Sequence, residues 1–222
     1  MTARAKFEAT LARADSLCRV YDEALAFAPK EHSEFDVEQR TRLDDILRAA
    51  LVLGVSAFDA FFTDRFAEVL VPFVKKFGAT KPLVALLEEA GLNVQAALEL
   101  AMMERPFWRV RSLVAAHHSR YVTQDLKRIN SLYAAYALPG ICARAERKAG
   151  RKTLCRNVNA AVQRRHAIVH AGDIKRRGGL NPIEPGWTQR RLADLRMLVQ
   201  YCDAIVADKM AEPAPRSRKR RA

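Results

Sequence analysis

Apolar residues recur every three or four positions along most of the chain, a spacing typical of amphipathic helices. The first segment with this pattern covers residues 3–28 and ends before Pro29. It has a single apolar stripe, which predicts a helix with one face against the core and the other toward solvent. Residues 1–30 are therefore expected to form an N-terminal cover helix.

The second apolar segment runs from Asp36 to about Phe77, and its middle is apolar nearly all round. That pattern predicts the central buried helix of the fold. Pro72 lacks a backbone donor and its ring crowds the preceding turn, so we expect a kink or a break there. Gly78 is expected to end the helix.

The same spacing predicts further helices, separated by glycine and proline. They cover residues 82–91, 94–104 and 107–121, a segment around 126–133 capped by Thr123, and residues 153–171. Gly172 fits a helix C-cap, and residues 172–187 have the composition of a loop. A last helix is predicted from a cap at Thr188 to about Met210.

Composition agrees with an all-α fold. Half of the 222 residues are hydrophobic, and nine glycines and nine prolines are few for this length. The simplest organisation is one helical domain over residues 1–210, which is long enough to bury a core. Residues 211–222 combine two prolines with a basic cluster and are expected to form a disordered tail.

The net charge of +13 is unevenly distributed. Residues 144–177 hold eleven Lys or Arg against Glu146 and Asp173, a net charge of +9, and residues 216–221 add five more basic side chains. A positive field in these places favours RNA as a partner. A generally basic, Ala- and Arg-rich composition would produce part of the excess as well.

One basic helix also carries candidate chemistry. Arg165 and His170 are separated by four residues, and His166 follows the arginine. Arginine holds phosphate with a planar set of donors, and histidine gives or takes a proton near neutral pH. On a helix His166 and His170 lie about 40° apart, whereas Arg165 and His170 lie about 140° apart. Arg165 and His170 therefore do not converge easily from one helix.

Residues 162–173 resemble the signature of HEPN domains, a helical superfamily rich in ribonucleases and in toxin or defence proteins. The family pattern is an arginine, a usually polar residue, and a histidine a turn or so later. Residues 47–61 resemble the first long core helix of the RiboL-PSP-HEPN-type subgroup, and residues 121–141 resemble its middle segment. The resemblance covers about residues 40–208.

The resemblance implies a HEPN-like helical bundle with additional short helices, and a homodimer in which the motifs of both subunits face one cleft. It also implies a metal-independent endoribonuclease that leaves a 2′,3′-cyclic phosphate, acting as toxin or effector in prokaryotic defence. His170 would be the general acid or base, Arg165 would stabilise the phosphoryl charge, and His166 would orient the phosphate or share the proton transfer. Arg164 is a weaker substitute for Arg165.

Other residues of the expected site have alternative interpretations. Asp59 of the buried helix would orient His170 or Arg165, or would be a buried acid paired for structure. Lys175, Arg176 and Arg177 follow the motif helix and would bind RNA, although such a loop also serves simply as a connection. His170 itself would alternatively cap the end of its helix.

No metal or nucleotide cofactor is expected, because the sequence has neither a Cys/His metal spacing nor a phosphate-binding glycine loop. Four scattered cysteines favour a cytoplasmic location. The longest apolar run, residues 49–58, predicts no membrane span. Expected partners are RNA and an antitoxin or other regulatory protein. The alternatives are a non-catalytic HEPN protein that binds nucleic acid or acts as a scaffold, and a helical adaptor whose basic tail binds a partner or a membrane surface.

Overall fold

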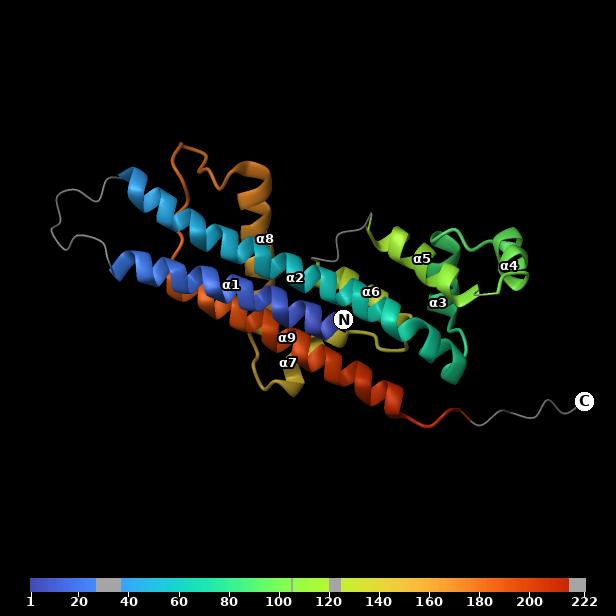
Figure 1. Ribbon diagram of the computed structural model, residues 1–222. Coiled ribbons are helices and arrows are strands. Elements are labelled where there is room, and N and C mark those ends of the chain that lie inside the picture. Colours follow the sequence, from blue (N-terminus) through green and yellow to red (C-terminus); the bar gives the residue numbers. More distant parts are fainter. Residues whose placement is uncertain (27–36, 105, 120–124, 216–222) are drawn as a thin grey trace, which may run out of the picture.

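A computed structural model of the protein describes residues 1–26, 37–104, 106–119 and 125–215. In these ranges the fold is all-helical, as predicted, with nine helices and one isolated β-bridge. Figure 1 shows three long helices side by side, the first running opposite to the other two. These are α1 (Ala3–Ala26), α2 (Val37–Phe77) and α9 (Pro185–Ala211).

Six shorter helices surround the three long ones: α3 (Lys81–Glu89), α4 (Val94–Ala101), α5 (Pro106–Ser119), α6 (Leu126–Ala134), α7 (Ile141–Lys148) and α8 (Leu154–Ala171). In Figure 1, α3, α4 and α5 lie together near the end of α2, whereas α8 crosses the long helices steeply. α8 packs against α2, α7 and α9. The predicted motif helix is therefore held by three neighbours.

Aromatic residues of α2 and of the segment around α6 form the centre of the core. The ring centroids of Phe66 and Tyr136 are 4.4 Å apart and nearly parallel. Both buried tyrosines also satisfy their hydroxyls, because Tyr133 donates to the carbonyl of Phe62 at 3.1 Å and Tyr136 donates to that of Phe66 at 2.6 Å. The core thus excludes water without leaving these polar groups unpaired.

Of the two outcomes expected at Pro72, a break does not occur, since α2 continues to Phe77, whereas a kink stays a prediction. Val69, Leu70 and Phe73 are all buried on either side of the proline. Their packing outweighs the local cost of the missing backbone donor. Gly78 ends the helix as predicted, with a φ of 78° and its amide bonded to the carbonyl of Val74 at 2.9 Å.

Near the motif, one helix boundary was predicted wrongly and one helix was not predicted. Thr188 is not a cap, because α9 begins at Pro185 and the hydroxyl of Thr188 donates to the carbonyl of Glu184 inside the first turn. Pro at the first helical position has its φ already set for a helix, so the predicted loop ends earlier. The basic stretch after residue 140 contains α7, whose buried Ile141 and Ala145 anchor a helix with a basic outer face.

Other predicted boundaries concern residues that the structure does not describe. Pro29, Asp36, Tyr121 and Thr123 are among them, as are residues 216–222 of the predicted tail. At the start of α6, the capping group in the described part is Asp125, whose carboxylate accepts a hydrogen bond from the amide of Lys127 at 2.8 Å.

Within α2, residues Arg42–Phe77 are long and apolar enough to span a membrane by length and composition alone. The longest uninterrupted apolar run inside this segment, residues 49–58, is by itself too short to cross a bilayer. The central helix of a soluble protein meets the same test, and here 56% of the apolar window is buried inside the protein. The finding is thus weak evidence for a membrane span.

Candidate functional site

α8 is fixed mainly by its first half, whereas its second half is half-buried to exposed. Leu154, Val158, Ala161 and Val162 are buried against the neighbouring helices. Gly172 ends α8 in the left-handed region at a φ of 59°, which confirms the predicted C-cap. His166 and His170 therefore lie on a well-anchored helix, close to its C-terminus.

The two histidines of α8 lie side by side. Their ring centroids are 5.5 Å apart and their planes differ by 22°, so the rings stack. His166 is half-buried and His170 is exposed. The four-residue spacing puts them on one face of the helix, as the helical periodicity predicts. Two imidazoles at this separation are able to act on one substrate as base and acid.

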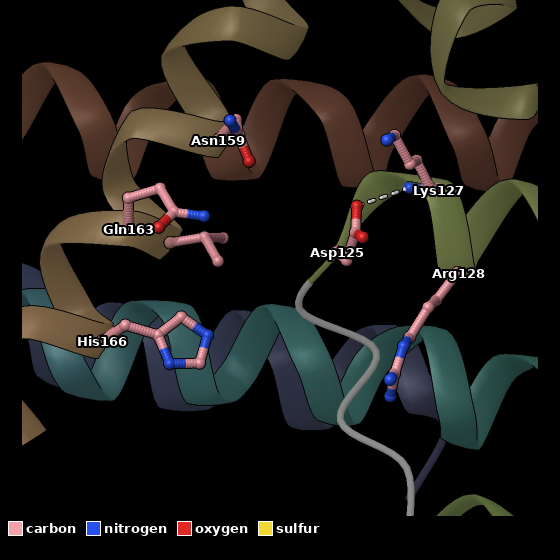
Figure 2. A pocket seen from close by; sticks show the side chains of 7 residues that line it. Asp125, Lys127, Arg128, Asn159, Gln163 and His166 are labelled. Atoms are coloured by element: carbon pink, nitrogen blue, oxygen red, sulfur yellow. Dashed lines mark hydrogen bonds between the residues drawn. The ribbon is translucent and has the colours of Figure 1, made fainter. Parts of the chain in front are cut away.

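His166 lines a pocket between α8 and the start of α6. The pocket has a volume of about 540 Å³. Figure 2 shows the His166 ring pointing from α8 toward Asp125 and Arg128 of the α6 side. Among the residues that the structure describes, the lining consists of Asp125, Lys127, Arg128, Asn159, Val162, Gln163 and His166. The described lining thus combines one imidazole, two amides, two cations and a carboxylate.

Arg165 lies on a different face of α8 from the two histidines. It follows buried Val158 by seven residues and buried Ala161 by four, so it continues their row on α8 and is itself half-buried. His166, one position further on, points about 100° away. By helix geometry Arg165 and His170 therefore occupy different faces of one helix. A joint action on one phosphate would depend on the length of the arginine side chain, on the geometry of the helix end, or on a second chain.

Arg164 belongs to a buried ion-pair cluster. Its guanidinium contacts the carboxylate of Asp173 at 2.7 Å, and Arg48 of α2 contacts the same carboxylate oxygen at 2.9 Å. Both arginines also donate to the carbonyl of Asn181. Asp173 is almost fully buried. In this structure Arg164 ties the end of α8 to α2 and to the following loop.

The loop after α8 folds back on itself as a small hairpin. Ile174 and Leu180 form an antiparallel bridge, and the amide of Gly178 donates to the carbonyl of Lys175 at 2.9 Å. Lys175, Arg176 and Arg177 are all exposed around this turn. The three residues expected to bind RNA thus project from a loop that the Asp173 cluster anchors beside the end of α8.

Asp59 is half-buried on α2. It lies 11 residues from Arg48, roughly 16 Å along the helix axis. Its carbonyl accepts the hydroxyl of Thr63 at 3.0 Å. The expected role of Asp59 in orienting His170 or Arg165 stays a prediction.

Five polar residues of the pocket were not predicted as site residues from the sequence. Asn159 and Gln163 precede His166 by seven and three residues, so with His170 they make a polar stripe along one face of α8. That spacing was a usable signal within the helix. Asp125, Lys127 and Arg128 belong to another helix, and nothing local in the sequence places them opposite His166.

Three cysteines that are far apart in the sequence come together behind α8. The thiol of Cys155 lies 3.5 Å from the carbonyl of Cys142, and Cys142 also interacts with Cys202. Burial raises the pKa of Cys155 to about 12, with a further contribution from Glu146. At neutral pH this thiol therefore stays protonated and is a poor nucleophile. Among the described residues, no group of His, Cys, Asp or Glu is arranged to hold a metal ion.

Comparison with family models, with characterised proteins and with solved structures finds no match for this chain. Its class is therefore defined by the fold and the site: an all-helical protein with a histidine pair beside a polar, cation-lined pocket.

Proposed function

We propose that the protein is a metal-independent endoribonuclease of HEPN type. The observation that carries the proposal is the stacked pair of His166 and His170, 5.5 Å apart, at the edge of a pocket that also contains Lys127 and Arg128. A HEPN-like arrangement of the helical bundle is part of the same proposal.

The reaction requires one base and one acid. One imidazole removes the proton of the RNA 2′-hydroxyl, whose oxygen attacks the adjacent phosphorus. The bond from phosphorus to the 5′-oxygen breaks, and the second imidazole, protonated, gives that oxygen its proton. The products are a 2′,3′-cyclic phosphate and a 5′-hydroxyl. Either imidazole is a candidate for the acid, since both rings lie on one face of α8.

In the proposed mechanism Arg165 acts through a second chain. Because it points about 100° away from His166, its guanidinium would stabilise the phosphoryl charge at a site formed by two subunits. The proposal therefore includes a homodimer. It also includes a role as toxin or effector in prokaryotic defence, in the cytoplasm, restrained by an antitoxin or other regulatory partner.

The test is RNA cleavage in excess EDTA, with mapping of the fragment ends. Wild type is expected to leave cyclic phosphate ends, and His170→Ala should reduce the rate by about 10² to 10⁴, the usual contribution of an acid or base. His166→Ala should have a similar effect. His117→Ala, which removes a histidine from α5, should cleave like wild type. A folded His170→Ala protein that retains the wild-type rate would contradict the assignment.

The second candidate is a HEPN-like protein that binds RNA or acts as a scaffold without cleaving. Two observations favour it: Arg164 is engaged by Asp173, and Arg165 lies on the face of α8 that carries Val158 and Ala161. Under this function wild type would bind RNA and would leave it intact, also in the presence of divalent cations and at protein concentrations that favour a dimer.

A further inference from the structure

We infer that Lys127 and Arg128 of α6 bind the phosphates of a single-stranded RNA whose nucleotide occupies the pocket beside His166. This inference rests on the proposed function and deepens it, because it assigns the phosphate contacts to the same chain as the histidine. It also names residues that the motif of α8 does not contain.

The charge of the pocket favours an anionic occupant. Among the described pocket residues, Lys127 and Arg128 face a single carboxylate, that of Asp125. One oxygen of this carboxylate is already used, because it accepts the amide of Lys127 at 2.8 Å and caps α6. The α6 side of the pocket therefore carries a net positive charge, and the N-terminus of a helix adds to it. An anionic group is the favoured occupant.

The size and the polar lining of the pocket fit a nucleotide. A volume of about 540 Å³ is far more than a lone phosphate needs and lies in the range of small-molecule sites. Across the pocket from the cations, Asn159 and Gln163 present amides that donate and accept hydrogen bonds, beside buried Val162. Amides of this kind read the edges of unpaired bases. The pocket thus matches a nucleotide, with its phosphate toward α6.

The histidine and the two cations reach the pocket from different helices. Figure 2 shows His166 entering the pocket from α8, with Lys127 and Arg128 on the opposite side, where their side chains point in different directions. A phosphate between the two helices would be within the reach of long cationic side chains and close to an imidazole. Arg165 does not line this pocket in the described structure, since the row it continues on α8 is that of Val158 and Ala161.

The experiment measures binding separately from cleavage. The probe is a fluorescent single-stranded RNA with 2′-O-methyl groups throughout, which lacks the attacking hydroxyl. The double variant Lys127→Gln/Arg128→Gln is expected to raise Kd at least about tenfold, because charged contacts to phosphate are lost. The control Arg13→Gln/Lys81→Gln removes the same charge from exposed positions of α1 and α3. It should change Kd by no more than about twofold.

Two outcomes would overturn the inference: a Lys127/Arg128 variant that binds no more weakly than the Arg13/Lys81 control, or a wild-type protein that does not bind the probe. Both pocket positions are exposed, and the melting temperature checks that the variant remains folded. A failure of the proposed function would give a different result in these experiments. In that case wild type binds the probe through Lys127 and Arg128, yet neither wild type nor His170→Ala cleaves ordinary RNA.

Discussion

At the scale of single residues, the most constrained polar group near the site is the carboxylate of Asp173. This carboxylate is almost fully buried and forms ion pairs with Arg48 and Arg164. The backbone of Asp173 has a φ of 58°, in the left-handed region. The amide side chain of Asn181 donates to its second oxygen at 3.2 Å. A buried charge is tolerated only when it is paired in this way, so the cluster depends on every member.

Asp173→Asn should destabilise the protein by about 3 kcal/mol, because it leaves Arg48 and Arg164 without their common counter-charge in a buried place. Asparagine tolerates the left-handed backbone, so the cost would come from charge and not from strain. Urea unfolding followed by circular dichroism measures it. The matched control is Asp64→Asn, which removes the exposed pair with Lys6 and should cost less than about 1 kcal/mol. Equal effects of the two changes would contradict this account.

At the scale of elements, one glycine sets how closely α2 approaches α9. A Cβ at Gly54 would overlap Cδ2 of Leu192 and would lie 3.5 Å from Leu11 and 3.6 Å from Leu195. α1, α2 and α9 therefore meet around this point without a side chain from position 54. All three leucines are buried, so none has free space into which to move.

Gly54→Ala should lower the free energy of unfolding by about 1 kcal/mol. Alanine improves helix propensity by up to about 1 kcal/mol, but overpacking of a core costs about 1 to 3 kcal/mol, so the loss is larger. The control is Gly186→Ala in the first turn of α9, where the added Cβ meets only the flexible end of Arg190 at 3.2 Å. That change is expected to stabilise slightly. Thermal unfolding of both variants checks the opposite signs.

At the scale of the whole molecule, the basic side chains near α8 belong to two separate structural elements. Lys127 and Arg128 belong to α6, whereas Lys175, Arg176 and Arg177 project from the hairpin that the Asp173 cluster anchors. α8 connects the two, since His166 lines the α6 pocket and Gly172 leads directly into the hairpin. A bound RNA strand would therefore be held on both sides of the histidine pair.

Replacement of Lys175, Arg176 and Arg177 by glutamine should make RNA binding less sensitive to salt. Each contact with a single-strand phosphate contributes about 0.7 to the slope of log K against log salt, so the slope should fall in magnitude by about 2. Fluorescence anisotropy from about 50 to 200 mM salt measures it. The variant Arg13→Gln/Arg19→Gln/Lys81→Gln loses the same charge elsewhere and should retain the wild-type slope. An unchanged slope in the hairpin variant would remove the hairpin from the RNA site.

Several features of the fold follow from the sequence alone, because they depend on local periodicity and on glycine. The central helix to Phe77, its end at Gly78, and the motif helix ending before Gly172 were all predictable. So was the pairing of His166 with His170, since a spacing of four residues puts them on one face of any helix.

Tertiary packing decided the rest. α2 continues through Pro72 because the residues on either side of the proline are buried in the core. Arg164 is part of an ion-pair cluster because the fold brings it to Asp173, 9 residues further along the chain, and to Arg48, 116 residues earlier. The pocket beside His166 exists only because α6 lies opposite α8. The sequence by itself determined which residues share a helix face. Only the folded structure decided which faces meet, because contacts between helices depend on packing that no local pattern encodes.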